Sequence, residues 1–308
     1  ALAQASMTRA ALATVGVDCR IEVIRTIGDK RPDLKLSEFS QGENPVVDKG
    51  IFTKELEEAL LKREIDFAVH SLKDVPTELG PEFEICATLP RADIADVFLT
   101  TQEGLGDDLT LLDGKVIATS AVRRARQLQW LCPGVSVVDI RGNVPTRIRK
   151  LIESQEWDAI LLASAGIERL GIYTPGNGSF DFEGTTVFAR ELDTRIFLPA
   201  AGQGAVGMEI LKDNHAAREA LAKINDAPTF CRVTAERAFL GLLKAGCQTP
   251  VGAHTWFEDD GASLAMAVRV FDEGTPLAEP FVAEVRGEAA SPESLALQLM
   301  NLKNERIS

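Results

Sequence analysis

The sequence predicts an α/β protein of two or three domains, and three features carry this prediction. Between residues 116 and 163, short apolar segments of strand character alternate with helical segments. Residues 263–271 and 281–286 have strand character without a helix between them, which is typical of a smaller antiparallel sheet in a further domain. The 308 residues, of which 45% are apolar, suffice for several hydrophobic cores.

The N-terminal part also alternates helix and strand. An alanine-rich helix is expected over residues 1–15, and a half-buried strand over 19–27, where polar and apolar side chains alternate. Residues 28–48 are rich in Gly, Pro, Asp, Ser and Asn, which predicts a long loop with a task such as covering a site. A helix over 53–63 and a short strand over 66–70 follow.

The central region predicts a mostly parallel sheet covered by helices. Its expected strands are 116–119, 135–140 and 159–163, and its expected helices are 121–131 and 146–154. Sites in such sheets lie beyond the C-terminal ends of the strands. The remaining segments are interpreted as a loop over 171–186, a turn into a strand over 198–210, and a helix over 229–243.

Composition excludes several classes of protein. The net charge of −13 disfavours a general nucleic-acid or anionic-membrane binder, because those partners select a broad basic surface. No apolar run approaches the roughly 20 residues that cross a bilayer. The five cysteines are widely spaced, so neither a zinc site nor a disulfide scaffold is expected, and a reducing, cytoplasmic compartment is the default. Because the chain begins inside an expected helix, a preceding targeting segment and an organellar location stay open.

Arginines gather at the expected starts of two helices, with Arg123 and Arg124 at the first and Arg141 and Arg147 at the second. A helix N-terminus carries roughly half a positive charge and unpaired N–H groups, so cations there require an anion between them. Over residues 121–150, seven basic residues face one acidic residue, which disfavours a solvated face with local ion pairs. Since guanidinium groups bind carboxylates bidentately, an organic acid is the predicted ligand and phosphate the second choice.

Asp74 is a candidate catalytic carboxylate, because it directly follows a short apolar strand. Pro76 restricts its own φ and holds Val75 extended, so the turn is rigid. A fixed carboxylate can stabilise a developing cation or transfer a proton, whereas the alternative is an aspartate that caps a turn. A hydrolase triad with His70 and Ser71 is disfavoured, because these residues are too close in sequence.

Two further motifs have competing interpretations. The glycines from Gly202 to Gly207 match Gly-x-Gly-x-x-Gly but lead into a strand rather than a helix, so a tight crossing between domains is favoured over a nucleotide site. Cys247 lies in a loop punctuated by Gly and Pro. It is either an inert cysteine or, as an exposed thiolate near cations, a nucleophile for covalent attachment.

Five segments, in order along nearly the whole chain, resemble the porphobilinogen deaminase family, whose members are also called hydroxymethylbilane synthases. They are His-Ser-Leu-Lys-Asp-Val-Pro at 70–76, Thr-Ser-Ala-Val-Arg-Arg at 119–124, Arg-Gly-Asn-Val-Pro-Thr-Arg at 141–147, Leu-Pro-Ala-Ala-Gly-Gln-Gly-Ala-Val-Gly at 198–207 and Gly-Cys-Gln-Thr-Pro-Val-Gly at 246–252.

The resemblance implies two domains similar to type II periplasmic binding proteins around a cleft, plus a small α/β C-terminal domain. Domain 1 is expected to comprise residues 1–92 and 198–213, domain 2 residues 93–197, and domain 3 residues 214–308. It also implies a first strand ahead of Ala1. Ala121, Pro45, Asp48 and the pair Ile94-Ala95 depart from the usual family residues, and these departures concern substrate contacts rather than the reaction.

The resemblance further implies a transferase that joins four porphobilinogen molecules head to tail into hydroxymethylbilane, with loss of ammonia. The chain grows on a dipyrromethane cofactor held by a thioether, and Cys247 matches the cysteine that carries it. Asp74 matches the catalytic aspartate, which would stabilise the positive charge left on a pyrrole nitrogen and handle the coupling proton.

Each pyrrole carries an acetate and a propionate, so the resemblance implies a site rich in cations and hydrogen-bond donors. The residues matching cofactor contacts are Lys73, Ser71, Thr119, Ser120, Arg123, Arg124, Arg141, Gly142 and Arg147, and those matching substrate contacts are Lys49, Arg169 and Gln203. Porphobilinogen is the expected substrate, and the product is expected to pass to uroporphyrinogen-III synthase. A monomer without metal, nucleic-acid or membrane partner is expected.

Two other functions remain as alternatives. A non-catalytic binding protein for a small organic acid would use the same arginines, but would need neither Asp74 nor a modified Cys247. Nucleic-acid binding through the arginines is disfavoured by the net charge and by the few aromatic residues, one Tyr and three Trp.

Overall fold

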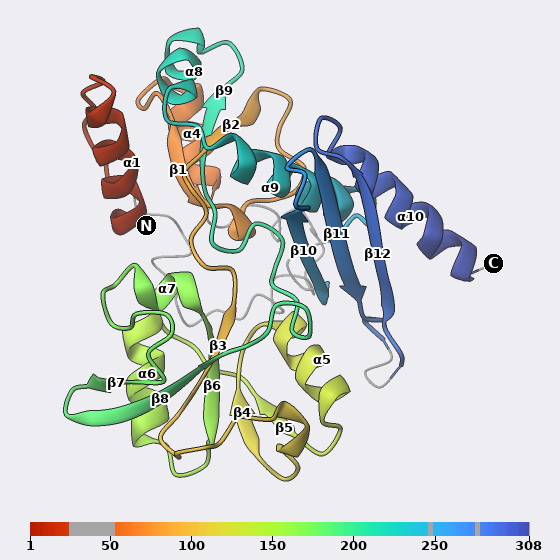
Figure 1. The fold of residues 1–308 in the computed structure, drawn as a ribbon. Helices are drawn as coiled ribbons and strands as arrows, with labels where there is room; N and C mark the ends of the chain where they lie inside the picture. The colour runs from red at the N-terminus through yellow and green to blue at the C-terminus, as the bar shows by residue number, and fades with distance from the viewer. Residues whose placement is uncertain (25–52, 246–248, 275–277, 308) are drawn as a thin grey trace, which may run out of the picture.

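The computed structural model describes residues 1–24, 53–245, 249–274 and 278–307. In this part of the chain the strands form three sheets, each with its own helices (Figure 1). This arrangement confirms the predicted α/β class and the predicted smaller antiparallel sheet near the C-terminus. None of the helices in the described ranges combines the length and apolar character needed to span a bilayer.

The first sheet has three antiparallel strands in the order β1-β9-β2, and it carries the predicted catalytic turn. The strands are Ala68–Ser71 (β1), Val206–Leu211 (β9) and Phe83–Thr88 (β2), and the neighbouring helices are Leu2–Thr14 (α1), Lys54–Leu61 (α4) and His215–Ala222 (α8). Leu12 of α1 and Leu221 of α8 pack with Met208 and Ile210 in one core, so strand burial and helix packing stabilise this sheet together.

The second sheet has six strands in the order β5-β4-β6-β3-β8-β7. They are Asp96–Thr100 (β3), Val116–Ala118 (β4), Ser136–Val138 (β5), Ala159–Ala163 (β6), Ser179–Phe182 (β7) and Thr185–Glu191 (β8). Helix Val122–Leu131 (α5) covers one face through Leu128, and helix Val144–Glu153 (α6) covers the other through Ile148. A short helix, Ser164–Glu168 (α7), follows β6.

The three strands predicted for the second sheet do pair in parallel, but the sheet as a whole is not mostly parallel as predicted. Only β4 pairs in parallel, with β5 and β6, whereas β3 is antiparallel to β6 and β8, and β7 is antiparallel to β8. The reason is that β3 enters this sheet from the first and the chain returns after β8, so these two strands run in opposite directions. The expected loop over 171–186 contains β7 and the start of β8, a hairpin whose turn is at Glu183 and Gly184.

The C-terminal sheet is antiparallel in the order β10-β11-β12. Its strands are Val251–Phe257 (β10), Ser263–Val270 (β11) and Phe281–Glu288 (β12), and its helices are Ala227–Leu242 (α9) and Glu293–Ile307 (α10). Phe239 of α9 and Leu295 of α10 pack with Met266 of β11 in one core. Helix α8, in contrast, packs on the first sheet, although it follows residue 213.

The strand expected over residues 19–27 is wrong for the part that the structure describes. Residues 19–24 have no regular secondary structure, and the Val23 side chain is 62% exposed. Alternation of polar and apolar residues yields a half-buried strand only where a neighbouring strand accepts its hydrogen bonds, and none of the described strands pairs with this segment. The loop expected over 28–48 lies outside the described residues.

Two chain segments connect the first and second sheets, and hydrogen bonds join them. Leu89 N donates to Val206 O at 3.0 Å, and Ala92 N donates to Gly204 O at 3.1 Å. Gly204 has φ +80°, and a Cβ atom there would lie 2.5 Å from Ala92 O, so only glycine allows this approach. The paired crossing brings the N-terminal ends of α5 and α6 toward the turn after β1.

Candidate active site

A cavity of about 520 Å³ lies between the turn after β1, the beginnings of α5, α6 and α7, and the crossing at Gly202–Ala205. Six residues predicted from the sequence line it: Ser71, Lys73, Arg124, Gly142, Arg147 and Arg169. They are separated by up to 98 positions in the sequence, since the farthest pair is Ser71 and Arg169. The fold therefore gathers cations from both sheets around one hollow.

Arg123 and Arg124 are buried side chains, which excludes the solvated helix face as their setting. Asp96, fully buried at the start of β3, accepts from Arg123 Nη1 at 2.7 Å and from Arg124 Nη2 and Nε at 2.7 and 3.0 Å. Their partner carboxylate thus comes from outside residues 121–150, where acidic residues are scarce. A count of charges between residues 121 and 150 could not include Asp96, which lies 27 positions before Arg123 in the sequence and is brought to it by the sheet.

The charges of this cluster do not cancel. Burial alone would raise the pKa of Asp96, but Arg123 and Arg124 outweigh it and hold that pKa well below its usual range. One ionised carboxylate thus faces two guanidinium groups, which leaves a surplus positive charge. Arg123 is turned away from the cavity, donating also to Leu198 O at 2.6 Å, whereas Arg124 lines the cavity.

Thr119 and Ser120 connect the beginning of α5 to the end of β5. Thr119 is buried, and its backbone N donates to Val138 O at 2.8 Å. Ser120 Oγ donates to Ile140 O and accepts from Ile140 N at 3.2 Å. Both residues lie beyond a strand C-terminus, as predicted, but neither lines the cavity.

The beginning of α6 is shaped by a cap and a glycine. Asn143 Oδ1 accepts from Thr146 N at 3.0 Å, which satisfies a free N–H of the first turn. Gly142 has φ +119°, and a Cβ there would meet Thr146 Cγ2 at 2.7 Å. Arg147 Nε donates to Gly142 O at 2.7 Å, so the turn directs this guanidinium to the cavity. Arg141 is less directed, because its Nε bonds Asp139 Oδ2 at 2.9 Å and it does not line the cavity.

Arg169, at the end of α7, reaches across to the crossing. Its Nη2 donates to Gly204 O at 2.6 Å. Its Nε is buried and makes no hydrogen bond within the described structure. An unpaired donor of this kind costs free energy unless a ligand or water accepts from it. Burial lowers the pKa of Arg169, and Glu168 opposes this effect.

Lys73 and Asp74 form the end of a single 3-10 turn, Leu72–Asp74, after β1, and both are exposed. Lys73 nevertheless lines the cavity, so its ammonium group is partly desolvated there. This desolvation lowers the pKa of Lys73 to about 8, with Asp74 opposing the shift and Arg124 adding to it. Asp74 does not line the cavity itself but directly follows a residue that does.

Gln203 is buried behind the cavity. Its Nε2 donates to Ile94 O at 2.8 Å and to Asp96 Oδ1 at 2.9 Å, so it braces the carboxylate that holds Arg124. The expected substrate contact through Gln203 is therefore not made by a side chain open to the cavity. Cys247 and Lys49 lie outside the described residues.

Two residues at the site were not predicted. Gln4 of α1 lines the cavity, is 7% exposed, and donates from Nε2 to Ser71 Oγ at 2.6 Å. A polar residue on the buried face of an alanine-rich helix was the available signal. Asp96, a carboxylate opening the otherwise apolar run Val97-Phe98-Leu99, was the other.

The arrangement suits a ligand with several carboxylates. Lys73, Arg124, Arg147 and Arg169 all face the same cavity, and Asp96 compensates only part of the charge behind them. Guanidinium groups in a partly dehydrated recess bind carboxylates more strongly than they do on an open surface. The exposed carboxylate of Asp74 lies beside the cations, where it can stabilise positive charge or accept a proton.

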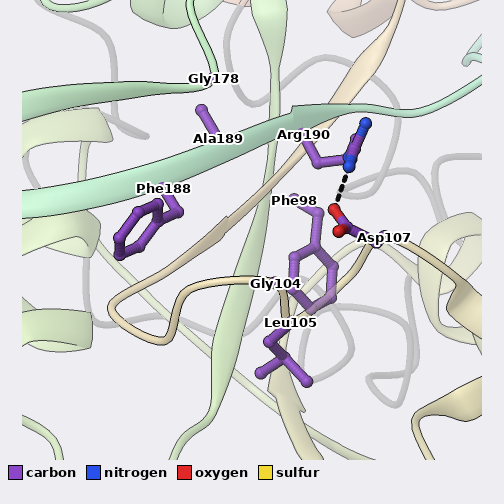
Figure 2. Close-up of a pocket in the computed structure, with 8 residues that line it drawn as sticks. All are labelled: Phe98, Gly104, Leu105, Asp107, Gly178, Phe188, Ala189 and Arg190. Atoms are coloured by element: carbon purple, nitrogen blue, oxygen red, sulfur yellow. Dashed lines mark hydrogen bonds and ion pairs between the residues drawn. The ribbon is translucent and has the colours of Figure 1, made fainter.

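A second recess of about 160 Å³ lies in the six-stranded sheet region and shares no residue with the first. Figure 2 shows Phe98, Leu105 and Phe188 around it, with Arg190 hydrogen-bonded to Asp107 at its edge. Because its arginine already has a carboxylate partner and its walls are mainly apolar, this recess lacks the cation cluster that the sequence predicted.

Comparison with known families agrees with the cation-lined cavity. Residues 1–219 match the family model described as "Porphobilinogen deaminase, dipyromethane cofactor binding domain", and residues 230–302 match "Porphobilinogen deaminase, C-terminal domain". The chain belongs to the porphobilinogen deaminase family. The resemblance inferred from five short segments is thereby confirmed.

Relatives described as porphobilinogen deaminases extend this result over most of the chain. The one from Syntrophobacter fumaroxidans is 40% identical over 275 residues, covering 88% of this chain and 82% of the relative. The one from Trichlorobacter lovleyi is 42% identical, covering 86% and 78%. The one from Thiobacillus denitrificans is 38% identical, covering 97% and 90%.

Similar solved structures include periplasmic ligand-binding domains. The BvgS VFT2 domain of Bordetella pertussis is 17% identical with a TM-score of 0.40, covering 76% of this chain and 83% of that domain. A periplasmic binding protein of an arginine transport system from Legionella pneumophila is 14% identical with a TM-score of 0.39, covering 72% and 80%.

As a member of this family, the protein is a transferase of porphyrin biosynthesis that joins porphobilinogen molecules into hydroxymethylbilane. Its cofactor is dipyrromethane, and the cavity fits such a group, because a buried Arg169 Nε lacks an acceptor and three further cations line the same wall. When bound, this cofactor supplies the primer on which the pyrrole chain grows. The protein residues supply the cations that hold carboxylates and a carboxylate that can move a proton.

Proposed function

We propose that the cavity is the active site of this hydroxymethylbilane synthase, with the roles predicted from the sequence. Asp74 is the catalytic carboxylate, and Cys247 carries the cofactor through a thioether. The observation that carries this proposal is the convergence of Lys73, Arg124, Arg147 and Arg169 on one hollow beside Asp74. A polycarboxylate requires such a set of cations, whereas a neutral substrate does not.

We assign the cofactor and substrate contacts in two groups. Lys73, Ser71, Arg124, Gly142 and Arg147 hold carboxylates directly, with Arg169 on the substrate side, and their support is their place on the cavity wall. Thr119, Ser120, Arg123, Arg141 and Gln203 contribute mainly by shaping that wall, because they do not line the cavity and their hydrogen bonds run to protein atoms. Lys49 remains a substrate contact proposed from the sequence.

Asp74 acts on charge rather than by covalent attack. Loss of ammonia leaves positive charge on the substrate pyrrole, and a fixed carboxylate nearby lowers the free energy of that state. The same carboxylate can accept the proton released at coupling. Its exposure beside the cavity supports both roles, since the reacting pyrrole must reach it.

We also propose the domain limits expected from the sequence, with domain 1 extended through α8, because that helix packs on the first sheet. A monomer is proposed from the resemblance found in the sequence. Release of the product to uroporphyrinogen-III synthase and a cytoplasmic location complete the proposal, and the bacterial origin of the relatives supports the latter.

An intact-mass measurement tests the attachment. The purified protein should carry the extra mass of two linked pyrroles, and Cys247→Ser should lack it. Cys231→Ser is the matched control, because Cys231 packs against the C-terminal core and its Sγ donates to Ala289 O. An active protein with an unmodified Cys247 would refute the attachment. A binding protein for a small acid, the alternative function, would bind porphobilinogen without releasing ammonia.

A further inference from the structure

One arginine outside the predicted site holds the turn that carries Asp74. Arg237, on α9, donates from Nη1 to Val75 O at 3.1 Å and from Nη2 to Pro76 O at 2.7 Å. A single planar guanidinium therefore binds the carbonyls of the two residues that directly follow Asp74. The planar fork fixes both the distance and the orientation of these carbonyls.

The opposite side of the turn is held as well. Leu72 N donates to Ala205 O at 3.1 Å, and Val75 N closes the 3-10 turn on Leu72 O at 3.3 Å. The backbone is therefore held on both sides of Asp74, by the Leu72–Ala205 hydrogen bond before it and by the two hydrogen bonds from Arg237 after it. An exposed side chain on a short turn has few packing contacts, so its position depends on how the backbone on each side is held.

Helix α9 provides a firm base for Arg237. The preceding residue, Glu236, is fully buried and accepts from Arg91 at 2.8 and 2.9 Å, from Gly202 N at 2.7 Å and from Thr255 Oγ1 at 2.6 Å. These bonds connect α9 to the crossing and to β10. Arg237 therefore transmits the position of α9 to the turn after β1.

The Arg237 guanidinium donates hydrogen bonds to backbone carbonyl groups rather than to a carboxylate. In the described structure, both side-chain hydrogen bonds of Arg237 go to backbone oxygens. Burial lowers the pKa of Arg237, and the negative charge of Glu209 opposes this shift. A half-buried guanidinium loses part of its hydration, so it needs protein acceptors in place of water. For Arg237 these acceptors are the carbonyl groups of Val75 and Pro76. The same helix ends at Leu242, five residues before Cys247 in the sequence.

We propose that Arg237 is a positioning residue that holds the Asp74 carboxylate in its working place against the reacting pyrrole. The inference rests on the proposed role of Asp74. A displaced carboxylate loses interactions made in the transition state, while Arg124, Arg147 and Arg169, which lie on other elements, stay in place. Loss of Arg237 should therefore lower kcat and leave KM and cofactor content nearly unchanged.

The test compares Arg237→Met with Arg237→Lys and with Arg232→Met on the same helix. Arg232 bonds only weakly, at 3.3 Å, to Pro228 O of its own helix, so its loss removes a charge without touching the turn. For each variant, kcat is measured per mole of protein carrying the two-pyrrole mass, together with KM and Tm. We expect kcat to fall about 10-fold in Arg237→Met, with KM within about twofold, and to recover in part in Arg237→Lys. Arg232→Met should match the parent.

A double-mutant cycle with Asp74→Asn separates positioning from general stability. If Arg237 acts through Asp74, Arg237→Met should cause no further loss in the residual rate of Asp74→Asn, whereas a purely structural role gives additive losses. Additive losses, an unchanged kcat in Arg237→Met, or a rise in KM alone would each overturn the inference. Asp74→Asn with normal turnover would instead refute the proposed function itself. If Arg237→Met does not fold, Arg237→Lys alone carries the same comparison.

Discussion

The Asp96 carboxylate binds the Arg124 guanidinium through two hydrogen bonds, at 2.7 and 3.0 Å, with both groups buried. This pair joins the start of β3 to the first turn of α5. Arg123 and Gln203 bind the same carboxylate, so it accepts bonds from three side chains. The position of Arg124 on the cavity wall therefore depends on a residue that does not line the cavity itself.

Replacing Asp96 with Asn should destabilise the protein strongly. The substitution leaves two buried guanidinium groups without a countercharge, which costs about 3–5 kcal/mol in comparable buried pairs. Urea unfolding at neutral pH measures the free energy of unfolding. Asp107→Asn is the control, because its partner Arg190 is exposed and little change is expected there. Equal losses in the two variants would contradict the buried cluster as described.

The same carboxylate should govern stability in acid. The pKa of Asp96 is lower in the folded state than in the unfolded chain, where it is about 3.9. Its stabilising contribution is therefore complete above that value and is lost as the pH falls through the folded pKa. Unfolding measured from pH 5 downward should show a smaller loss of stability for Asp96→Asn than for the parent. If the parent and Asp96→Asn lost stability equally as the pH falls, the pKa of Asp96 would not be lowered in the folded state.

Activity should decline on the alkaline side because of Lys73, whose pKa is lowered to about 8. Above that pH the ammonium group loses its proton, and the cavity loses one of the cations that bind carboxylates. The profile of kcat/KM should therefore show a limb near pH 8. Lys73→Arg keeps the charge, so this limb should move to higher pH. If the alkaline decline of kcat/KM stayed near pH 8 in Lys73→Arg, it would reflect the titration of a group other than Lys73.

Gly204→Ala should weaken both the fold and substrate binding. The residue has φ +80°, and its Cβ would lie 2.5 Å from Ala92 O, so backbone must shift at a cost of about 2 kcal/mol or more. Because Gly204 O also accepts from Arg169, that guanidinium should move and KM should rise. Gly178→Ala, where a Cβ meets open space, is the control for stability measured by urea unfolding. An unchanged KM in Gly204→Ala would show that Arg169 does not contribute to substrate binding.

Asp74→Ala should abolish most turnover without affecting folding. The side chain is exposed, so its loss removes little packing, whereas loss of a charge-stabilising group costs about 10³-fold in rate. Ammonia release measured per mole of cofactor-loaded protein tests this, with Glu78→Ala on the same loop as a comparison. Turnover near that of the parent would remove Asp74 from its role.

Local patterns predicted most of the helices and strands of this protein. Strand 159–163 and helix 229–243 were located within two residues, because apolar periodicity and caps act over a few neighbouring positions. The hairpin β7-β8 was missed, since its Gly, Thr and Asn composition resembles that of a loop and only its pairing with β3 defines it as sheet. Strand β3 was not predicted either, and its direction is set by where the chain enters the sheet.

By itself, the amino-acid sequence determined the family, the α/β class and the set of cations that a polycarboxylate requires, because these depend on residue type and order. The tertiary structure alone decided which of those cations face the cavity. Arg123 and Arg124 are adjacent in sequence and both bind Asp96, yet only Arg124 lines the cavity, while Arg123 also donates to Leu198 O. Such a choice depends on contacts between residues far apart in the chain, which the local pattern of charges does not contain.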